Sequence, residues 1–156
     1  MANRRFLLVF VLMLLATPGF SQSAETRAKQ FYIEDSYAID GYDLVAYLTE
    51  EKAKEGKKAY AVTHEGVTYL FSTEQNKTKF MGDPEKYLPA YGGWCAYALA
   101  ENGKKMKPDP ETFKIQDGRL YLFYNSFFNN TLPKWNKKPS EMKNSADKVW
   151  AGMLKQ

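Results

Sequence analysis

The sequence predicts an α+β protein: a single small domain of two β-hairpins with short helices, followed by an amphipathic helix at the C-terminus. Three observations predict this class. Two pairs of β-rich runs each flank a two-residue turn that contains glycine. Prolines, glycines and capping residues divide the rest of the chain into short helical segments. An apolar stripe with helical spacing lies near the C-terminus.

The first residues have the layout of a secretory signal peptide. Arg4 and Arg5 precede an apolar run from Phe6 to Ala16, and helix breakers and small residues follow it. The run is shorter than the about 20 residues that span a bilayer, so an uncleaved membrane anchor is the less favoured alternative. We therefore expect a signal peptide over residues 1–23 and a periplasmic or secreted protein that meets the membrane only through that signal.

The rest of the chain is expected to form a flexible lead-in at residues 24–36 and one small domain at residues 37–156. Removal of the signal takes away two arginines and no acid, so the net charge falls from +4 to +2. A charge this small and dispersed argues against a nucleic-acid partner. The eleven tyrosines and ten phenylalanines predict a core built largely from aromatic rings.

The first hairpin is predicted over residues 60–71, with its turn at Glu65-Gly66. A helix over residues 72–81 follows it, and Ser72 is the expected N-cap because Gln75, three residues later, completes a capping box. Proline suits the first position of a helix, so the Asp-Pro pair that comes next begins another short one.

The second half of the domain follows the same pattern. A helix is predicted over residues 94–101, and a second hairpin over residues 113–124 surrounds an Asp-Gly turn. Phe127-Phe128 is interpreted as a continuation of the core strand, with a ligand groove as the alternative. The amphipathic helix is expected over residues 140–154.

Cys95 is the only cysteine of the chain. An exported protein normally pairs its thiols or dispenses with them, so a lone thiol is either buried and inert or kept for chemistry. A helix that begins here would favour a thiolate, and neighbouring glycines allow a close approach of the backbone. The expected site is therefore centred on Cys95 and shaped by five neighbours: Tyr91, Gly92, Gly93, Trp94 and Tyr97.

His64, the only histidine, is the candidate second metal ligand. One cysteine and one histidine exclude a thiolate-rich structural zinc site, a blue-copper centre and a c-type haem within this chain. Low-coordinate Cu(I), held by Cys95 with His64 or a methionine, remains, as does a mixed site completed by carboxylates. We expect copper or another soft metal ion, and neither haem nor a nucleotide.

Four segments, in a fixed order, carry a family resemblance: residues 41–47, 66–72, 80–87 and 91–96. They resemble exported YHS-domain proteins, which are linked to TRASH-like metal-binding modules. The resemblance implies binding or trafficking of heavy metals. In those modules the second hairpin strand is followed approximately by Phe-Cys-Ser-x-x-Cys, but here Phe71 is followed by Ser-Thr-Glu-Gln-Asn. The usual cysteines are absent, which leaves Cys95 as the candidate ligand.

The leading hypothesis is thus an exported, non-enzymatic module that binds a metal ion or another small ligand through Cys95. A thiol enzyme or redox protein is the alternative, with His64 as the base and an acid such as Asp109 or Asp117 to orient it. A structural or partner-binding domain, in which the cysteine is buried and incidental, is the third.

Overall fold

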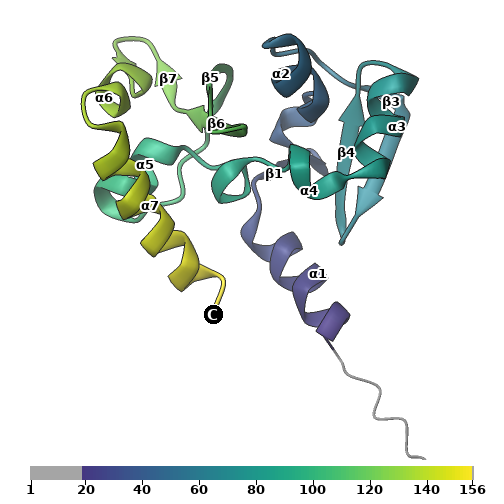
Figure 1. Cartoon of the computed structure of the whole chain (residues 1–156), viewed down its shortest axis with the longest axis horizontal. Coiled ribbons are helices and arrows are strands. Elements are labelled where there is room, and N and C mark those ends of the chain that lie inside the picture. The colour runs from purple at the N-terminus through teal and green to yellow at the C-terminus, as the bar shows by residue number, and fades with distance from the viewer. Residues whose placement is uncertain (1–18, 156) are drawn as a thin grey trace, which may run out of the picture.

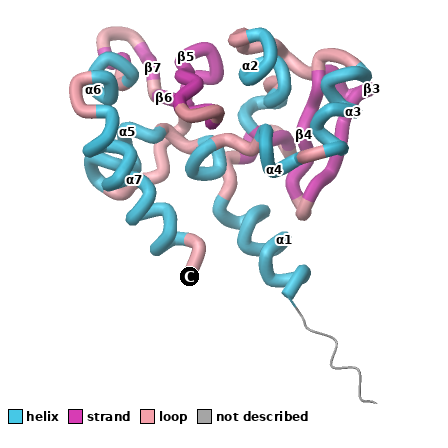
Figure 2. The backbone as a smooth tube through the Cα atoms, viewed as in Figure 1, coloured by secondary structure: helices cyan, strands magenta, loops and turns pink. Residues whose placement is uncertain are grey.

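The computed structural model describes residues 19–155, and the side chains from residue 25 onward. It confirms the α+β class: helices alternate with two-stranded antiparallel sheets (Figure 1, Figure 2). The helical elements are α1 (Gly19–Gln30), η1 (Ile39–Gly41), α2 (Leu44–Glu50), α3 (Glu74–Gly82), α4 (Pro84–Tyr87), η2 (Ala90–Gly93), α5 (Ala96–Asn102), α6 (Leu132–Asn136) and α7 (Pro139–Met153). The strands are β1 (Ile33–Glu34), β2 (Tyr37–Ala38), β3 (Lys57–His64), β4 (Val67–Phe71), β5 (Asp109–Gln116), β6 (Arg119–Phe123), β7 (Asn125–Ser126) and β8 (Asn129–Asn130). Within these residues, none of the helices combines the length and the apolar character that crossing a bilayer requires.

The molecule has two halves, and each half contains one long hairpin. In Figure 1 the β3–β4 hairpin lies with α2, α3 and α4 on one side, while α5, α6 and α7 gather beyond β5–β6 on the other. Strand β6 is the wall between two buried clusters. Leu120 and Leu122 belong to the first cluster, whereas Tyr121 and Phe123 belong to the second. Successive residues of a strand face opposite sides, so this apolar run serves both cores.

Both predicted hairpins are confirmed. In the first, His64 pairs with Val67 across the turn, and in the second Gln116 pairs with Arg119. Both residues of each turn have positive φ, at Glu65-Gly66 (46° and 77°) and at Asp117-Gly118 (52° and 72°). Turns with two positive φ angles match the right-handed twist of the strands, which is why Asp-Gly and Glu-Gly fit here. The second hairpin starts at Asp109, four residues before the predicted position.

The first helix after the hairpin begins one residue later than predicted. Thr73, not Ser72, is the N-cap of α3, because its hydroxyl accepts the N–H of Asn76 at 3.1 Å. Ser72 instead donates its hydroxyl to Asp43 at 2.6 Å. A side chain that satisfies a buried carboxylate is no longer free to cap the helix, so the tertiary contact overrides the local capping signal.

The segment expected as a flexible lead-in is regular structure. Residues up to Gln30 form α1, and β1 pairs with β2. Aromatic contacts hold this segment in place: Phe31 lies 6.2 Å from Trp150 and Tyr32 lies 5.0 Å from Trp94, between ring centroids. The sequence showed these residues only as polar and mixed, because their apolar partners are distant in the chain. Residues 1–18 of the predicted signal peptide lie outside the described residues.

The C-terminal helix is confirmed as α7, whose stripe packs on the second core. Ala146 is buried within it, and Met142 and Val149 pack against it. The expectation for Phe127 and Phe128 is wrong: both are fully exposed, at 99% and 106% of the reference surface. They form the tip of the short β7–β8 hairpin, because the core strand β6 ends at Phe123.

Gly56 provides a test of how closely the backbone of the first half is packed. A Cβ at this position would lie 2.5 Å from the carbonyl carbon of Leu70, which is backbone and cannot rotate away. We expect Gly56→Ala to lower the free energy of unfolding by about 1–3 kcal/mol. Gly82→Ala is the matched control, since no heavy atom lies within 4 Å of its Cβ. Urea denaturation measures both, and equal stabilities would contradict the packing described.

Candidate functional site

Cys95 is fully buried directly before α5. Its Sγ accepts the N–H of Tyr124 at 3.2 Å and lies 3.5 Å from Oγ1 of Thr131. The Thr131 hydroxyl donates to the carbonyl of Tyr124 at 2.9 Å, so the thiol proton can in turn be donated to Thr131. The sulfur therefore works as a hydrogen-bonded packing residue that joins α5 to the end of β6. Of the alternatives left open by the sequence, the burial favours a packed cysteine over an accessible thiol.

The residues expected to shape a thiol site form a packing hub instead. Tyr91, Gly92 and Gly93 make the turn η2, all with positive φ (55°, 59° and 89°). A Cβ on Gly92 would lie 2.6 Å from the Phe31 ring and 2.9 Å from the Trp150 ring, so glycine allows these rings to close over the turn.

Two aromatic side chains of the same motif, Trp94 and Tyr97, contact other segments of the chain. Trp94 donates its indole N–H to the carbonyl of Gln30 at 2.7 Å, which fixes the end of α1. Tyr97 has Lys134 over its ring, with Nζ 5.9 Å from the centroid. The motif therefore joins the N-terminal segment to the second half of the fold.

The structure does not bring His64 to Cys95. His64 lies at the end of β3, with Nε2 3.4 Å from Oε1 of Glu85 and its ring edge-on to Phe80. Figure 1 shows β3 and α5 on opposite sides of the molecule. A thiol–imidazole pair, as metal ligands or as nucleophile and base, therefore cannot form in this arrangement.

His64 instead belongs to a cluster with Glu65 and Glu85. One donor atom from each of these three residues lies within 4.8 Å of the others. Glu65 follows His64 in the hairpin turn, and Glu85 is on α4, whose first residue is the proline of the predicted Asp-Pro start. Imidazole nitrogen and carboxylate oxygen are ligands for zinc and other divalent transition ions.

A guanidinium is the cation that these acids hold in the structure. Arg27 of α1 places Nε 2.6 Å from Oε2 of Glu65 and Nη2 3.0 Å from Oε1 of Glu85. Its Nη1 is buried and lacks a hydrogen-bond partner among the described residues. No local sequence pattern predicts this contact, because it depends on α1 folding back onto the hairpin.

A buried phenol completes the cluster. Tyr69 is 1% exposed, and its hydroxyl has no hydrogen-bond partner in the described part of the chain. Burial raises the pKa of Tyr69, and the nearby Arg27 acts in the opposite direction. An unsatisfied hydroxyl at a buried position is a donor or acceptor that a ligand could engage.

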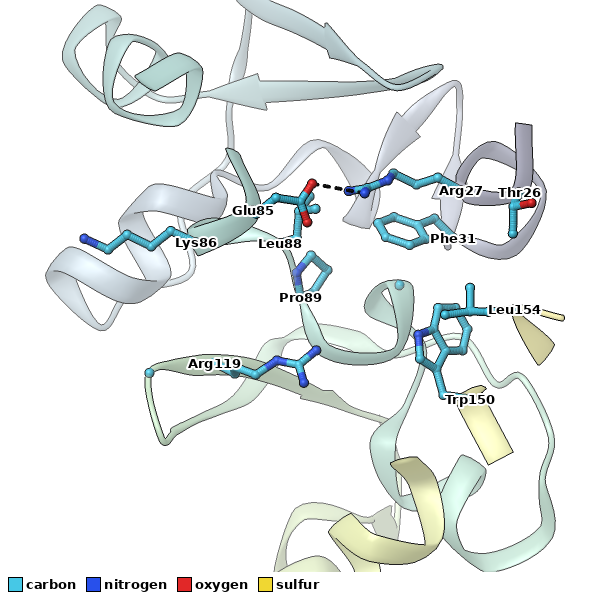
Figure 3. Close-up of a pocket in the computed structure, with 12 residues that line it drawn as sticks. Thr26, Arg27, Phe31, Glu85, Lys86, Leu88, Pro89, Arg119, Trp150 and Leu154 are labelled. Carbon is cyan, nitrogen blue, oxygen red and sulfur yellow. Dashed lines mark ion pairs between the residues drawn. The ribbon is translucent and has the colours of Figure 1, made fainter. Parts of the chain in front are cut away.

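Arg27 and Glu85 of this cluster also line a cavity of about 880 Å³ between α1, α4 and α7 (Figure 3). One wall is apolar, with Phe31 and Trp150 as its rings. Arg119 points into the space from the β5–β6 turn, while Lys86 points away. A guanidinium facing apolar walls is chemically suited to an organic anion with an apolar body.

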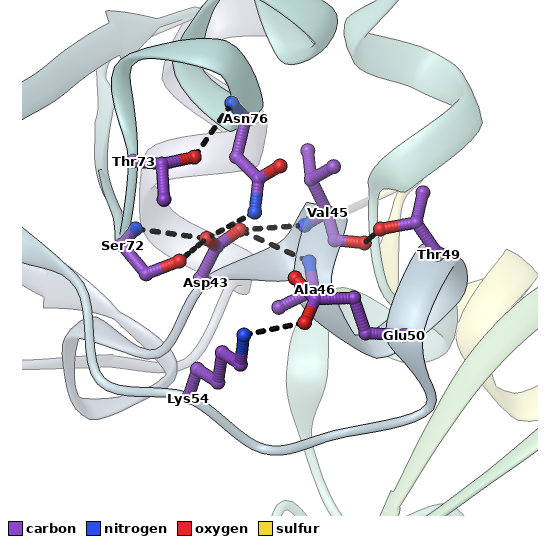
Figure 4. A network of polar contacts seen from close by, with 9 residues as sticks. All are labelled: Asp43, Val45, Ala46, Thr49, Glu50, Lys54, Ser72, Thr73 and Asn76. Atoms are coloured by element: carbon purple, nitrogen blue, oxygen red, sulfur yellow. Dashed lines mark hydrogen bonds and ion pairs between the residues drawn. The ribbon is translucent and has the colours of Figure 1, made fainter.

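The positions at which the resemblance expects cysteines hold a different cross-link. Ser72 and Asn76 occupy them, and both donate to Oδ2 of the buried Asp43 (Figure 4). The hydroxyl of Ser72 lies at 2.6 Å, its N–H at 2.8 Å, and the amide of Asn76 at 2.7 Å. The other oxygen of Asp43 caps α2 through Val45 and Ala46. All five groups donate hydrogen bonds, so these residues do not fit a metal ion.

Fold and site together define a small α+β hairpin module with a histidine–carboxylate cluster at its rim. Residues 49–91 match the sequence model of the YHS domain family. This segment contains β3, β4, α3 and α4, and with them His64, Glu65 and Glu85, but it ends before Cys95. The chain carries a YHS domain, a family associated with metal binding. Neither the curated proteins nor the solved structures contain a match to this chain.

Because Asp43 accepts five hydrogen bonds, we expect a conservative substitution of this residue to cause a large loss of stability. Asp43→Asn keeps the shape but directs an N–H₂ group at donors, so we expect the free energy of unfolding to fall by about 2–4 kcal/mol. Asp117→Asn is the matched control, because it lies in an exposed turn at φ 52°, which asparagine tolerates. Thermal denaturation followed by circular dichroism measures both variants. Similar midpoints would show that the buried carboxylate is dispensable.

Asp147 on α7 predicts how stability depends on pH. Burial raises its pKa, but hydrogen bonds from Lys143 (2.7 Å) and Tyr91 (2.9 Å) outweigh burial, and the net pKa is lowered. The ionised form therefore stabilises the fold above about pH 4, and this stabilisation is lost as the pH falls through the lowered native pKa. The difference in melting temperature between wild type and Asp147→Asn should be constant near neutral pH and shrink in acid. A difference that grows in acid would contradict this sign.

Proposed function

We propose that the protein is a metal-binding module whose divalent ion is held by His64, Glu65 and Glu85 of the YHS domain. The observation that carries the proposal is the proximity of the three donor atoms, all within 4.8 Å. The hydroxyl of Tyr69 also supports it, since it has no hydrogen-bond partner among the described residues and lies near Arg27, Glu65 and Glu85. This donor set favours zinc or Cu(II) over the soft Cu(I) expected from the sequence.

The ion competes with Arg27 in this proposal. The guanidinium now pairs with both carboxylates, so a metal ion has to displace it before it can bind. Two cations within a few ångströms repel one another by several kcal/mol at an effective dielectric constant of about 20. The wild-type affinity should therefore be modest and controlled by the position of α1.

Copper held through Cys95 is the finer hypothesis from the sequence. Its support is the lone thiol and the family resemblance. Against it stand the complete burial of the sulfur and its hydrogen bonds with Tyr124 and Thr131. Export and periplasmic or secreted localisation are part of the proposal on the strength of the signal-like N-terminal sequence alone.

Titration with Zn²⁺ and Cu²⁺ by isothermal calorimetry tests the proposal. We expect Arg27→Gln to bind at least about tenfold more tightly than wild type, and His64→Ala to lose most of the binding. Lys148→Gln, which removes a positive charge from an exposed position outside the cluster, is the matched control for Arg27→Gln, and Cys95→Ser should bind as wild type does.

Two results would overturn this assignment. If His64→Ala and Arg27→Gln both bind as wild type does, the cluster is not the site. If Cys95→Ser alone abolishes binding, the site is the thiol. Melting temperatures of each variant without metal separate a change in affinity from a loss of folding.

A further inference from the structure

The tip of the β7–β8 hairpin exposes two adjacent phenylalanines. Strand β7 pairs with β8 through Asn125 with Asn130 and Ser126 with Asn129, and Phe127-Phe128 connects them (Figure 1). Both side chains are as exposed as in an extended peptide, at 99% and 106%. The remaining exposed large apolar residues among those described are partly covered, at 37–52%.

The backbone at this tip is also unfavourable for phenylalanine. Phe127 has φ 47°, in the left-handed region that glycine and asparagine adopt far more readily. Asparagine is present at Asn125, Asn129 and Asn130, yet the strained turn position holds an aromatic ring. Neither ring stabilises the folded chain, so a gain that offsets both costs must come from a contact outside it.

The size and shape of the tip favour a lipid surface over a protein partner. Two phenylalanines can bury about 300–500 Å² together, well below the about 800 Å² per partner of a stable protein interface. A protruding aromatic pair needs a matching hollow in a protein, whereas the interfacial region of a bilayer accepts such rings without one.

The charge around the tip selects the kind of lipid. Between Phe123 and Ser140 the sequence has three lysines and no acid. Lys134 is held beside the tip, because its Nζ donates to Oδ1 of Asn129 at 2.8 Å. Asp109 is the nearest carboxylate with a contact to the hairpin, 3.3 Å from the Asn125 amide at the base. The cationic side chains fit an anionic membrane surface.

We propose that Phe127 and Phe128 insert into the interface of an anionic bilayer, with Lys134 and its neighbour Lys137 on the headgroups. This gives the protein a membrane contact separate from the N-terminal segment expected from the sequence. It does not depend on the metal site, which lies in the other half of the fold.

Co-sedimentation with vesicles tests the proposal. Vesicles of phosphatidylcholine alone are compared with vesicles that also contain phosphatidylglycerol, at low and high salt. We expect wild type to bind the anionic vesicles, and Phe127→Ser with Phe128→Ser to weaken that binding by about tenfold or more. Met81→Ser, a half-exposed apolar residue on α3, is the matched control and should bind as wild type does.

Each variant is compared with its own parent, both as the full chain and as a chain starting at Ala24, because the N-terminal apolar run has its own affinity for lipid. Thermal melting checks that each form folds. The Phe128→Trp variant adds a tryptophan at the tip. If the additional fluorescence, relative to the parent protein, is quenched by brominated lipid, the tip lies within the bilayer.

Three outcomes would overturn the inference. In the first, wild type stays in the supernatant with anionic vesicles. In the second, the double serine variant sediments with them as wild type does. In the third, the double variant loses self-association in the absence of lipid, which would assign the tip to a second copy of this chain.

Discussion

One buried carboxylate, that of Asp43, holds the first half of the fold together. Its two oxygens accept five hydrogen bonds: two from the start of α2 and three from the end of β4 and the start of α3. Hydrogen bonds to a charged acceptor are about twice as strong as neutral ones, and the residue is completely buried. The hairpin and the helix that precedes it are therefore positioned by a single side chain, and β3 in turn positions His64.

This cross-link occupies the positions at which the family resemblance implies metal-binding cysteines. A thiolate pair and its metal ion would join the end of the hairpin to the next helix by covalent-like bonds. Ser72 and Asn76 make the same connection by donating to Asp43. Because they are donors, they hold an anion where the related pattern holds a cation. The proposed cation site lies instead at the opposite end of the hairpin, in the turn beside His64.

Local signals allowed much of the fold to be predicted, and distant contacts account for what was missed. The Glu-Gly and Asp-Gly turns predict both hairpins from a few neighbouring residues. The spacing of the apolar stripe predicts α7 in the same local way. The docking of α1 depends on Arg27 reaching Glu85, 58 positions away, and on Phe31 reaching Trp150. The same limit applies to the site. His64 and Cys95 were paired by residue type, but the fold places them in different halves of the molecule, each with its own neighbours. Phe127 and Phe128 were assigned to the core by composition, since nothing local marks where β6 ends.

Arg27 links the proposed metal site to the N-terminal helix. While the guanidinium pairs with Glu65 and Glu85, it occupies the carboxylates that the ion would need and holds α1 against the hairpin. A metal ion that takes the same carboxylates releases that hold, so binding the ion and docking α1 oppose each other. Consider a partner that binds α1 only when α1 is undocked. Thermodynamic reciprocity requires that this partner raises the affinity for metal by the factor by which metal raises the affinity for the partner. Because Phe31 and Trp94 also anchor this segment, the aromatic contacts set how much of the docking energy the ion has to overcome.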